Sequence, residues 1–187
     1  MKSLEEINKY WHKANKCEIK KTATRPVFGD GNSKSKIIFI GEAPGKEEDL
    51  SGKPFVGRSG KFLSEMLSLI KLKREDVYIT NTVKYRPPNN RDPKPEEIKE
   101  CMNWLFEEIN FINPELIVFL GRHSLNIFFP KEKISESHGK LLHKNLEGVN
   151  TKNFLALYHP AAALYNVGMK ETLIKDFKKI PKILEKL

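Results

Sequence analysis

The chain has 187 residues, enough for one domain with a sizeable core and barely enough for two. Its 33 Lys and Arg against 24 Asp and Glu give a formal net charge of +9, which is common in proteins that bind polyphosphates and equally compatible with a merely basic soluble protein. The sequence has no membrane-spanning apolar run and no signal-peptide core, and its two cysteines form neither a disulfide framework nor a paired metal-ligand motif. We therefore expect a soluble cytoplasmic protein without a membrane partner.

The predicted elements alternate between helices and strands. Ser3 to Glu6 has the pattern of a capping box and predicts a helix over residues 3–16. Four short runs, apolar on both faces, predict central strands of a buried parallel sheet at residues 37–40, 77–80, 116–120 and 154–158. Helix-period segments separate these runs, and the last helix, over residues 168–187, should kink or split at Pro181. With no internal repeat or long linker, the pattern predicts one α/β domain over residues 1–187.

Ligands of open α/β sheets bind outside the carboxyl ends of the strands. In this sequence three of the four strand ends carry polar, Gly or Pro residues: "GEAPG" from Gly41, "NTVKYRPPNNR" from Asn81, and "HPAAAL" from His159. The remaining end, "GRHS" from Gly121, is interpreted as the start of a helix. We therefore expect one site formed by the three polar ends.

The turn from Gly41 to Gly45 offers closely spaced backbone N–H groups that can approach a planar or anionic ligand. It is not a phosphate-binding P-loop or a dinucleotide motif, because the required Gly-Lys-Ser/Thr ending and GxGxxG pattern are missing. A Gly-Pro turn is more often structural. Within it, the Glu42 carboxylate could orient a water molecule or stabilise a developing cation, or it could simply lie in solvent.

Three further residues each have a functional and a structural interpretation. Phe55, in a polar loop bounded by glycines, could stack under a base or cover the edge of the core. Asn81 offers a donor and an acceptor that match one edge of a pyrimidine, or it could form a cap or an Asx turn. His159 could donate to a leaving-group oxygen or be structural. Four basic residues near rigid prolines could form a wall that contacts a nucleic-acid backbone: Lys84, Arg86, Arg91 and Lys94.

Five segments resemble, in order, those of the iron–sulfur type (family 4) uracil-DNA glycosylases: "RPVFGDGN", "GEAPGKEEDLSGKPFVGRSG", "VYITNTVKYRPPNNRDPKPEEIKEC", "PELIVFLG" and "YHPAAAL". The resemblance covers roughly residues 17–164. It implies a three-layer α/β/α sandwich with a central, mainly parallel four-stranded sheet, on which the first and last helices pack. It also implies a monofunctional enzyme, acting as a monomer on nucleoid DNA, that flips uracil out of single- or double-stranded DNA, hydrolyses its N-glycosidic bond and leaves an abasic site.

The resemblance also assigns roles to individual residues. It implies that Phe55 stacks on the flipped uracil, that Asn81 reads its polar edge, and that His159 hydrogen-bonds its O2 and stabilises the departing anion. Glu42 would help the hydrolytic water, and Glu48 would lie near C5 of the base and exclude the methyl group of thymine. The remaining substrate-binding residues would be Gly41, Ala43, Gly45 and Asp49, and the DNA-binding residues would be Lys84, Arg86, Arg91, His138 and Ala161.

The sequence departs from this family at the cluster site. The family holds a four-iron, four-sulfur cluster with four cysteines, whereas here the four places are occupied by Ala14, Cys17, Tyr85 and Cys101. Two thiolates cannot complete such a site, so we predict that Cys17 and Cys101 are remnants and that the protein has no cluster and no other cofactor. The first helix would then be held to the Cys101 helix by packing, for which the bulky candidates are Trp11, Tyr85 and Trp104; plain core filling is the alternative.

Other departures bear on function. The family commonly has Arg-Gly where this chain has His138-Gly139, a change that would weaken a DNA contact. The basic, histidine-ending insertion of relatives that bond covalently to DNA is missing after Asn81. Two alternatives remain open: a glycosylase for another deaminated base such as hypoxanthine or xanthine, and a catalytically silent DNA-binding relative. Retention of Glu42, Asn81 and His159 together argues against the silent relative.

Overall fold

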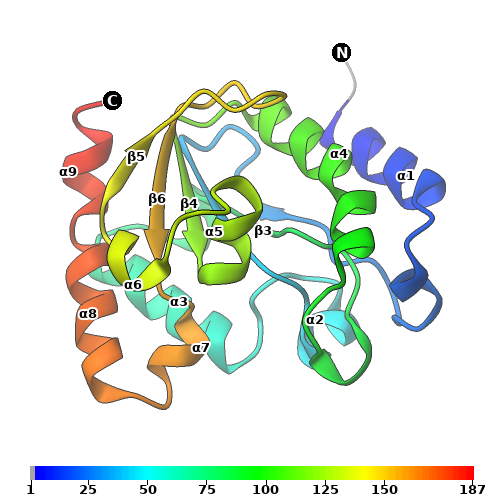
Figure 1. Cartoon of the computed structure of the whole chain (residues 1–187), viewed down its shortest axis with the longest axis horizontal. Helices are drawn as coiled ribbons and strands as arrows, with labels where there is room; N and C mark the ends of the chain where they lie inside the picture. The colour runs from blue at the N-terminus through cyan, green and yellow to red at the C-terminus, as the bar shows by residue number, and fades with distance from the viewer. Residues whose placement is uncertain (1–2) are drawn as a thin grey trace.

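A six-stranded sheet runs through the middle of the computed structural model, which describes residues 3–187 (Figure 1). The four central strands are parallel, as the apolar runs predict. Along the sheet they follow one another as β3 (Tyr78–Asn81), β2 (Ile37–Gly41), β4 (Leu116–Leu120) and β6 (Asn153–Leu157).

The prediction of four strands misses the two edges of the sheet. There β1 (Asp30–Gly31) runs antiparallel to β3, and β5 (Leu141–His143) runs antiparallel to β6. Neither edge strand is fully buried, and β1 has only two residues, so neither leaves an apolar run in the sequence. Both edges lie to the sides of the parallel strands and do not alter the strand ends.

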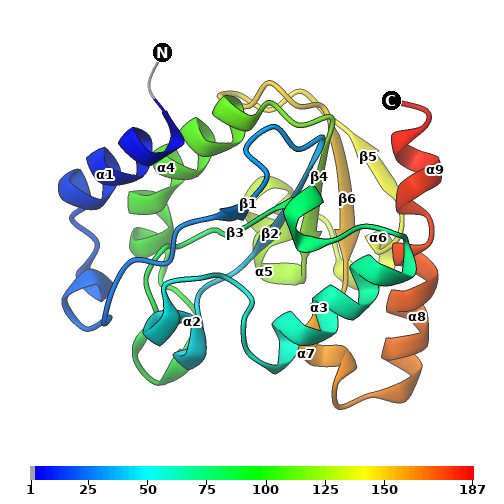
Figure 2. The ribbon, with the colours of Figure 1, turned by 180° about the vertical axis from the view of Figure 1, so that it is seen from behind.

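Helices cover both faces of the sheet, which confirms the three-layer sandwich (Figures 1 and 2). The side chains of β2 alternate between the layers: Ile37 and Phe39 pack against α3, α8 and α9, whereas Ile38 and Ile40 pack against α4 and α5. The first layer contains α3 (Arg58–Leu69), α7 (Pro160–Ala163), α8 (Val167–Phe177) and α9 (Ile180–Leu184), and the second contains α4 (Pro95–Ile112), α5 (Arg122–Phe128) and α6 (Ile134–Ser137).

The first helix, α1 (Leu4–Ala14), packs against α4 beside the sheet. Its capping box forms, because the Ser3 hydroxyl accepts from the Glu6 N–H and the Glu6 carboxylate accepts from the Ser3 N–H. The last helical segment is split before Pro181, which lies in the first turn of α9, where a missing N–H costs nothing. Short helical turns connect the other elements: η1 (Glu18–Lys21), α2 (Lys46–Ser51), η2 (Arg74–Asp76) and η3 (Pro88–Asn90).

Within residues 3–187, no helix combines the length and the apolar character that crossing a membrane requires. The loops after β2, β3 and β6 all emerge at the carboxyl end of the parallel strands (Figure 1). These loops carry most of the residues to which the sequence assigns a function, so the fold brings them to one end of the sheet.

Candidate active site

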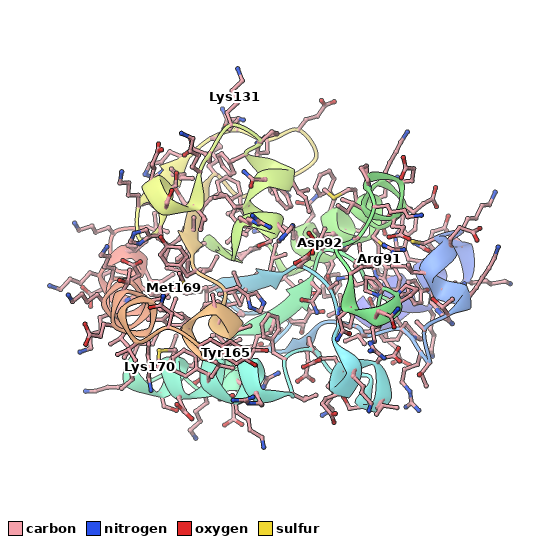
Figure 3. The ribbon with its side chains drawn as sticks, turned by 60° about the horizontal axis from the view of Figure 1, so that its bottom comes forward. Arg91, Asp92, Lys131, Tyr165, Met169 and Lys170 are labelled. Carbon is pink, nitrogen blue, oxygen red and sulfur yellow. The ribbon has the colours of Figure 1, made fainter. Side chains whose placement is uncertain are left out.

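A cavity of about 370 Å³ opens at the carboxyl ends of β2, β3 and β6. In a view onto this end, Arg91 and Asp92 lie on one side of the strand ends, and Tyr165 and Met169 lie on the other (Figure 3). The volume is suited to one planar base rather than to a large cofactor. The cavity is lined by Glu42, Ala43, Gly45, Glu48, Phe55, Ser59, Asn81, Asn90, His159 and Ala161.

The floor of the cavity is set by the pairing of β2 with β3. Gly41 and Asn81 are partners in this register, so the two strands end side by side. A Cβ atom at Gly41 would lie 2.4 Å from the Asn81 side-chain oxygen and 2.6 Å from the Phe55 ring. Glycine at position 41 therefore lets the amide and the ring meet at the base of the cavity.

Phe55 holds an uncommon backbone conformation, with a φ of 52°. The Arg74 guanidinium fixes this turn by donating to the carbonyl oxygens of Phe55 and Pro54 at 2.9 and 2.8 Å. The Phe55 ring lies 5.7 Å from the His159 ring, centroid to centroid, at an interplanar angle of 30°. Phe55 therefore presents a preformed wall beside the histidine.

His159 is fixed as a neutral donor. It caps α7, and its Nδ1 accepts the backbone N–H of Ala161 at 3.1 Å, so the proton of the neutral ring lies on Nε2. Burial lowers the pKa of His159 to about 4, and the nearby His123 acts in the same direction. At neutral pH the ring therefore offers one N–H donor without a positive charge.

Glu42 lies directly after β2, and its environment disfavours the charged form. Burial, with the charge of Asp92 acting in the same direction and that of Arg122 against it, raises the pKa of Glu42 to about 7. Among the described residues, the buried Oε1 atom has no hydrogen-bond partner. A carboxylate with such a pKa in a cavity suits acid–base chemistry.

Glu48 fixes the loop that carries Phe55. Its carboxylate accepts from the backbone N–H groups of Gly45 at 3.1 Å, Val56 at 3.0 Å and Gly57 at 2.9 Å. These contacts tie the start of α2 to the residues that follow Phe55. Glu48 therefore shapes the cavity; the exclusion of a methyl group at C5 stays a prediction.

Asp49, predicted to bind substrate, does not line the cavity. Its carboxylate accepts from the Thr24 N–H at 2.9 Å and from the Thr24 hydroxyl at 2.6 Å, and it anchors the segment before β1. Asp49 is therefore a structural residue. By contrast, Ala43, Gly45 and Ala161 do line the cavity.

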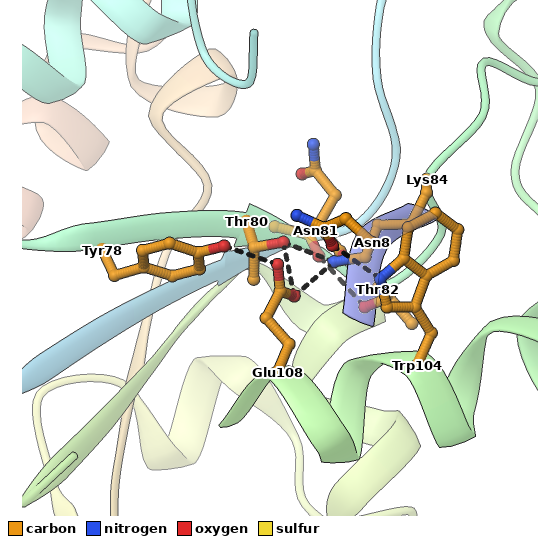
Figure 4. A network of polar contacts seen from close by, with 9 residues as sticks. Asn8, Tyr78, Thr80, Asn81, Thr82, Lys84, Trp104 and Glu108 are labelled. Atoms are coloured by element: carbon orange, nitrogen blue, oxygen red, sulfur yellow. Dashed lines mark hydrogen bonds and ion pairs between the residues drawn. The ribbon is translucent and has the colours of Figure 1, made fainter. Parts of the chain in front are cut away.

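The DNA-contacting role predicted for Lys84 is wrong. The Lys84 side chain is fully buried and pairs with the fully buried carboxylate of Glu108 from α4 at 2.5 Å (Figure 4). It also donates to the Thr80 hydroxyl and to the Asn81 carbonyl at 3.0 Å, and Tyr78 donates to Glu108 at 2.7 Å. The lysine supports the strand behind the cavity, and DNA cannot reach it.

The other predicted DNA-binding residues lie nearer the surface. Arg86 is half-exposed and donates to the Asn90 side chain at 2.7 Å, and Arg91 pairs with Glu97 at 2.6 Å. His138 is held away from the cavity, since its Nδ1 lies 2.6 Å from the carboxylate of Asp176 on α8. The two arginines thus shape the loop after β3, whereas His138 ties α6 to α8.

The four places of the family's cluster do not offer a cluster site. Cys17 and Cys101 are buried, and the Cys17 thiol donates to the Glu97 carbonyl at 3.7 Å; the neighbouring Cys101 raises the pKa of Cys17, and Cys17 lowers the pKa of Cys101. Tyr85 is buried and has no thiol with which to ligate iron, and its hydroxyl lies 3.0 Å from His12 Nδ1. Ala14 has no ligand atom. A four-cysteine cluster therefore does not fit these residues.

Packing joins α1 to α4 at this place. A buried cluster contains Ile7, Cys17, Tyr85, Cys101 and Trp104, and Trp11 packs against it. The indole N–H of Trp104 donates to the Asn8 side chain at 2.9 Å. The aromatic residues therefore occupy the seam between the two helices.

We predict that purified protein carries no stoichiometric iron and that Tyr85→Ala lowers the free energy of unfolding by about 3–5 kcal/mol, because it leaves a cavity in this seam. Tyr85→Phe, which loses only the hydroxyl, should cost about 1 kcal/mol. Metal analysis and urea unfolding measure both. Stoichiometric iron, or equal losses in the two variants, would refute this view of the seam.

The sequence analysis misses the lining residues Ser59 and Asn90 and two residues beside the cavity. His123, at the start of α5, lies with Nδ1 3.6 Å from the Glu42 carboxylate, and Asp92 lies 3.5 Å from Nε2 of the same ring. The segment "GRHS" indicates only a helix start. The sequence signal that could have identified His123 is its position just after a predicted parallel strand, at the same end of the sheet as the other loops.

Comparisons with known proteins identify the family of the chain. A family model described as the uracil DNA glycosylase superfamily matches residues 28–187. The type-4 uracil-DNA glycosylase of Archaeoglobus fulgidus is 46% identical over 100% of this chain and 96% of its own length. The corresponding enzymes of Saccharolobus solfataricus and Thermotoga maritima are 45% and 37% identical, each over 98% of this chain and over 88% and 95% of their own lengths. The chain belongs to the uracil DNA glycosylase superfamily.

Proposed function

We propose that this chain is a monofunctional uracil-DNA glycosylase, which hydrolyses the N-glycosidic bond of uracil in DNA and leaves an abasic site. Its sequence identity of 37–46% with type-4 uracil-DNA glycosylases, over at least 98% of the chain, supports this function. The observation that carries it in the structure is the convergence of Glu42, Phe55, Asn81 and His159 on one cavity of base size. These are the residues that a flipped uracil requires.

The chemistry follows from these side chains. The target base leaves the stack at a cost of a few kcal/mol and enters the cavity, where Phe55 stacks on it and the Asn81 amide pairs with its polar edge. The C1′–N1 bond breaks with its electron pair going to N1, and the Nε2–H of His159 stabilises the negative charge at O2. Water forms the new bond to C1′ and loses its proton toward Glu42, whose carboxylate also stabilises the cationic sugar.

A substrate panel tests the function. Oligonucleotides that contain U·G, U·A, single-stranded U, T·G or hypoxanthine·T are incubated with the protein and cleaved at abasic sites. Uracil-only cleavage that Asn81→Ala abolishes is the expected result. Preferred cleavage of hypoxanthine would favour the alternative glycosylase, and DNA binding without any cleavage would favour a silent relative. Strand preference, a monomeric state and association with nucleoid DNA stay predictions.

DNA contacts are proposed for the rim of the cavity. Arg86 and Arg91 lie on one side, where their guanidinium groups can reach phosphates. On the side of α7, Tyr165 is 79% exposed, and the guanidinium of Arg58 lies 5.7 Å from the centroid of its ring. An exposed aromatic beside a cation suits contact with an opened base stack.

We expect kcat/KM to rise with pH through about 7 and to level off above it. Burial raises the pKa of Glu42 to about 7, and only the ionised carboxylate accepts a proton from water. His159, with its pKa lowered to about 4, stays a neutral donor over this range. Steady-state rates from pH 5 to 9 measure the profile. In Glu42→Gln the rise of kcat/KM between pH 5 and about 7, the acidic limb of the profile, should be missing. A limb centred near pH 4 instead would refute the role of Glu42.

A further inference from the structure

A second polar cluster lies against the wall of the cavity, on the far side of Glu42. It contains Glu42 after β2, Asp92 from the loop after β3, and Arg122 and His123 at the start of α5. Nδ1 of His123 lies 3.6 Å from Glu42 Oε1, and Nε2 lies 3.5 Å from Asp92 Oδ2. The imidazole therefore lies between two carboxylates, one at each ring nitrogen.

The backbone places this ring beside the catalytic residues. Gly121, which joins β4 to α5, has a φ of 98°, and its N–H donates to the carbonyl of Leu157 at 2.8 Å. A Cβ atom at Gly121 would lie 3.0 Å from the Cβ of His159. The start of α5 is thus packed against the histidine loop. A smaller cavity of about 230 Å³ is lined by both His123 and Glu42. Glu42 therefore lies between this smaller cavity and the base-sized cavity, which it also lines.

The hydrogen bond at Nε2 of His123 places the ring proton on Nδ1, the nitrogen nearer to Glu42. The Arg122 Nε–H donates to His123 Nε2 at 3.2 Å, so the neutral ring carries its proton on Nδ1. The protonated ring carries a proton there as well. In both states the Nδ1–H group faces Glu42 Oε1, which is buried and has no hydrogen-bond partner among the described residues.

We propose that His123 is a positioning residue that holds the Glu42 carboxylate ionised and aimed at the hydrolytic water. This inference rests on the proposed glycosylase function. The charged groups around Glu42 act in opposite directions: Asp92 disfavours a second negative charge, whereas Arg122 favours it. The Nδ1–H of His123 adds a directed donor to the favourable side, and a directed donor fixes an orientation that a distant charge cannot.

A metal ion bound by Glu42, Asp92 and His123 is the competing interpretation, because one ligand atom from each lies within 4.8 Å of the others. The geometry argues against a single ion. The two carboxylates lie at opposite nitrogens of one imidazole, and a single ion can bind only one of the two nitrogens. Arg122 also donates to one of these nitrogens and brings a positive charge to the cluster.

The test compares His123→Ala with His123→Asn on a U·G oligonucleotide. The Asn amide nitrogen can replace Nδ1, whereas Ala has no donor. We expect His123→Ala to lower kcat about tenfold without a change in KM, and to move the acidic limb of the pH profile to higher pH. His123→Asn should restore most of kcat. Asp92→Asn, which removes the charge that raises the pKa of Glu42, should move the limb to lower pH.

Controls separate this inference from the proposed function. His143→Ala removes an exposed histidine on the edge strand β5 and should leave kcat and the pH profile unchanged. A wild type that cleaves uracil while His123→Ala has the same kcat and profile would overturn the inference alone. A wild type without glycosylase activity would overturn the function and the inference together. Activity that is lost on chelation and restored by a divalent ion would replace the inference with a metal site.

Discussion

Replacement of His159 by alanine is expected to lower kcat by about 10²–10³-fold, which is the usual effect of removing one preorganised donor to a developing anion. The neutral ring accepts the N–H of Ala161 at Nδ1, so its one N–H donor is the Nε2–H group. Binding of the base depends more on Phe55 and Asn81, so KM should change little. Single-turnover cleavage of a U·G oligonucleotide measures the rate of the chemical step.

His159→Gln is the matched control, because the Gln amide nitrogen can take the place of Nε2. We expect it to retain more activity than His159→Ala. The pH profile should keep its acidic limb near 7 in both variants, since that limb belongs to Glu42. If His159→Ala keeps kcat within a factor of about two, the histidine is not the anion-stabilising group.

Lys84→Ala is expected to lower the free energy of unfolding by about 3–5 kcal/mol, the cost of leaving a buried charge without its partner. Lys84 and Glu108 are both fully buried, and among the described residues the carboxylate would keep the hydroxyls of Tyr78 and Thr80 as its donors. Urea unfolding, read at constant slope m, measures the loss. If Lys84 instead contacted DNA from the surface, the change would weaken DNA binding and leave stability almost unchanged.

The double variant Lys84→Met with Glu108→Gln is the control for this prediction. It removes both charges together; the Gln amide oxygen can still accept from Tyr78, and its NH2 group can donate to the Thr80 hydroxyl oxygen, which accepts from Lys84 in the wild type. We expect it to recover most of the stability that Lys84→Ala loses. A double variant as unstable as Lys84→Ala would mean that the ion pair itself supports β3, because methionine keeps most of the volume of the lysine side chain.

The central sheet and the place of the cavity could be predicted because they depend on local patterns. Strands buried on both faces leave uninterrupted apolar runs, and parallel strands bring their carboxyl ends to one edge of the sheet. Gly41, Asn81 and His159 each follow such a run directly, so their meeting required no knowledge of distant contacts. The edge strand β1 was missed because two residues carry no pattern.

Residues whose roles depend on a distant partner could not be assigned. Lys84 stands among basic residues and prolines, and only the fold shows that it points inward to Glu108 on α4. The Asp49 carboxylate likewise accepts a hydrogen bond from Thr24, which precedes it by 25 residues. His123 and Asp92 come from different loops that meet only at Glu42. In each case the charge is visible in the sequence, but its partner is not.

The most direct test of the account is the single-turnover rate of base release from a U·G oligonucleotide, compared with the matched T·G oligonucleotide, by protein whose iron content is measured on the same preparation. Efficient release of uracil, negligible release of thymine and no stoichiometric iron are predicted. Failure to release uracil, by a folded protein that binds the oligonucleotide, would contradict the account.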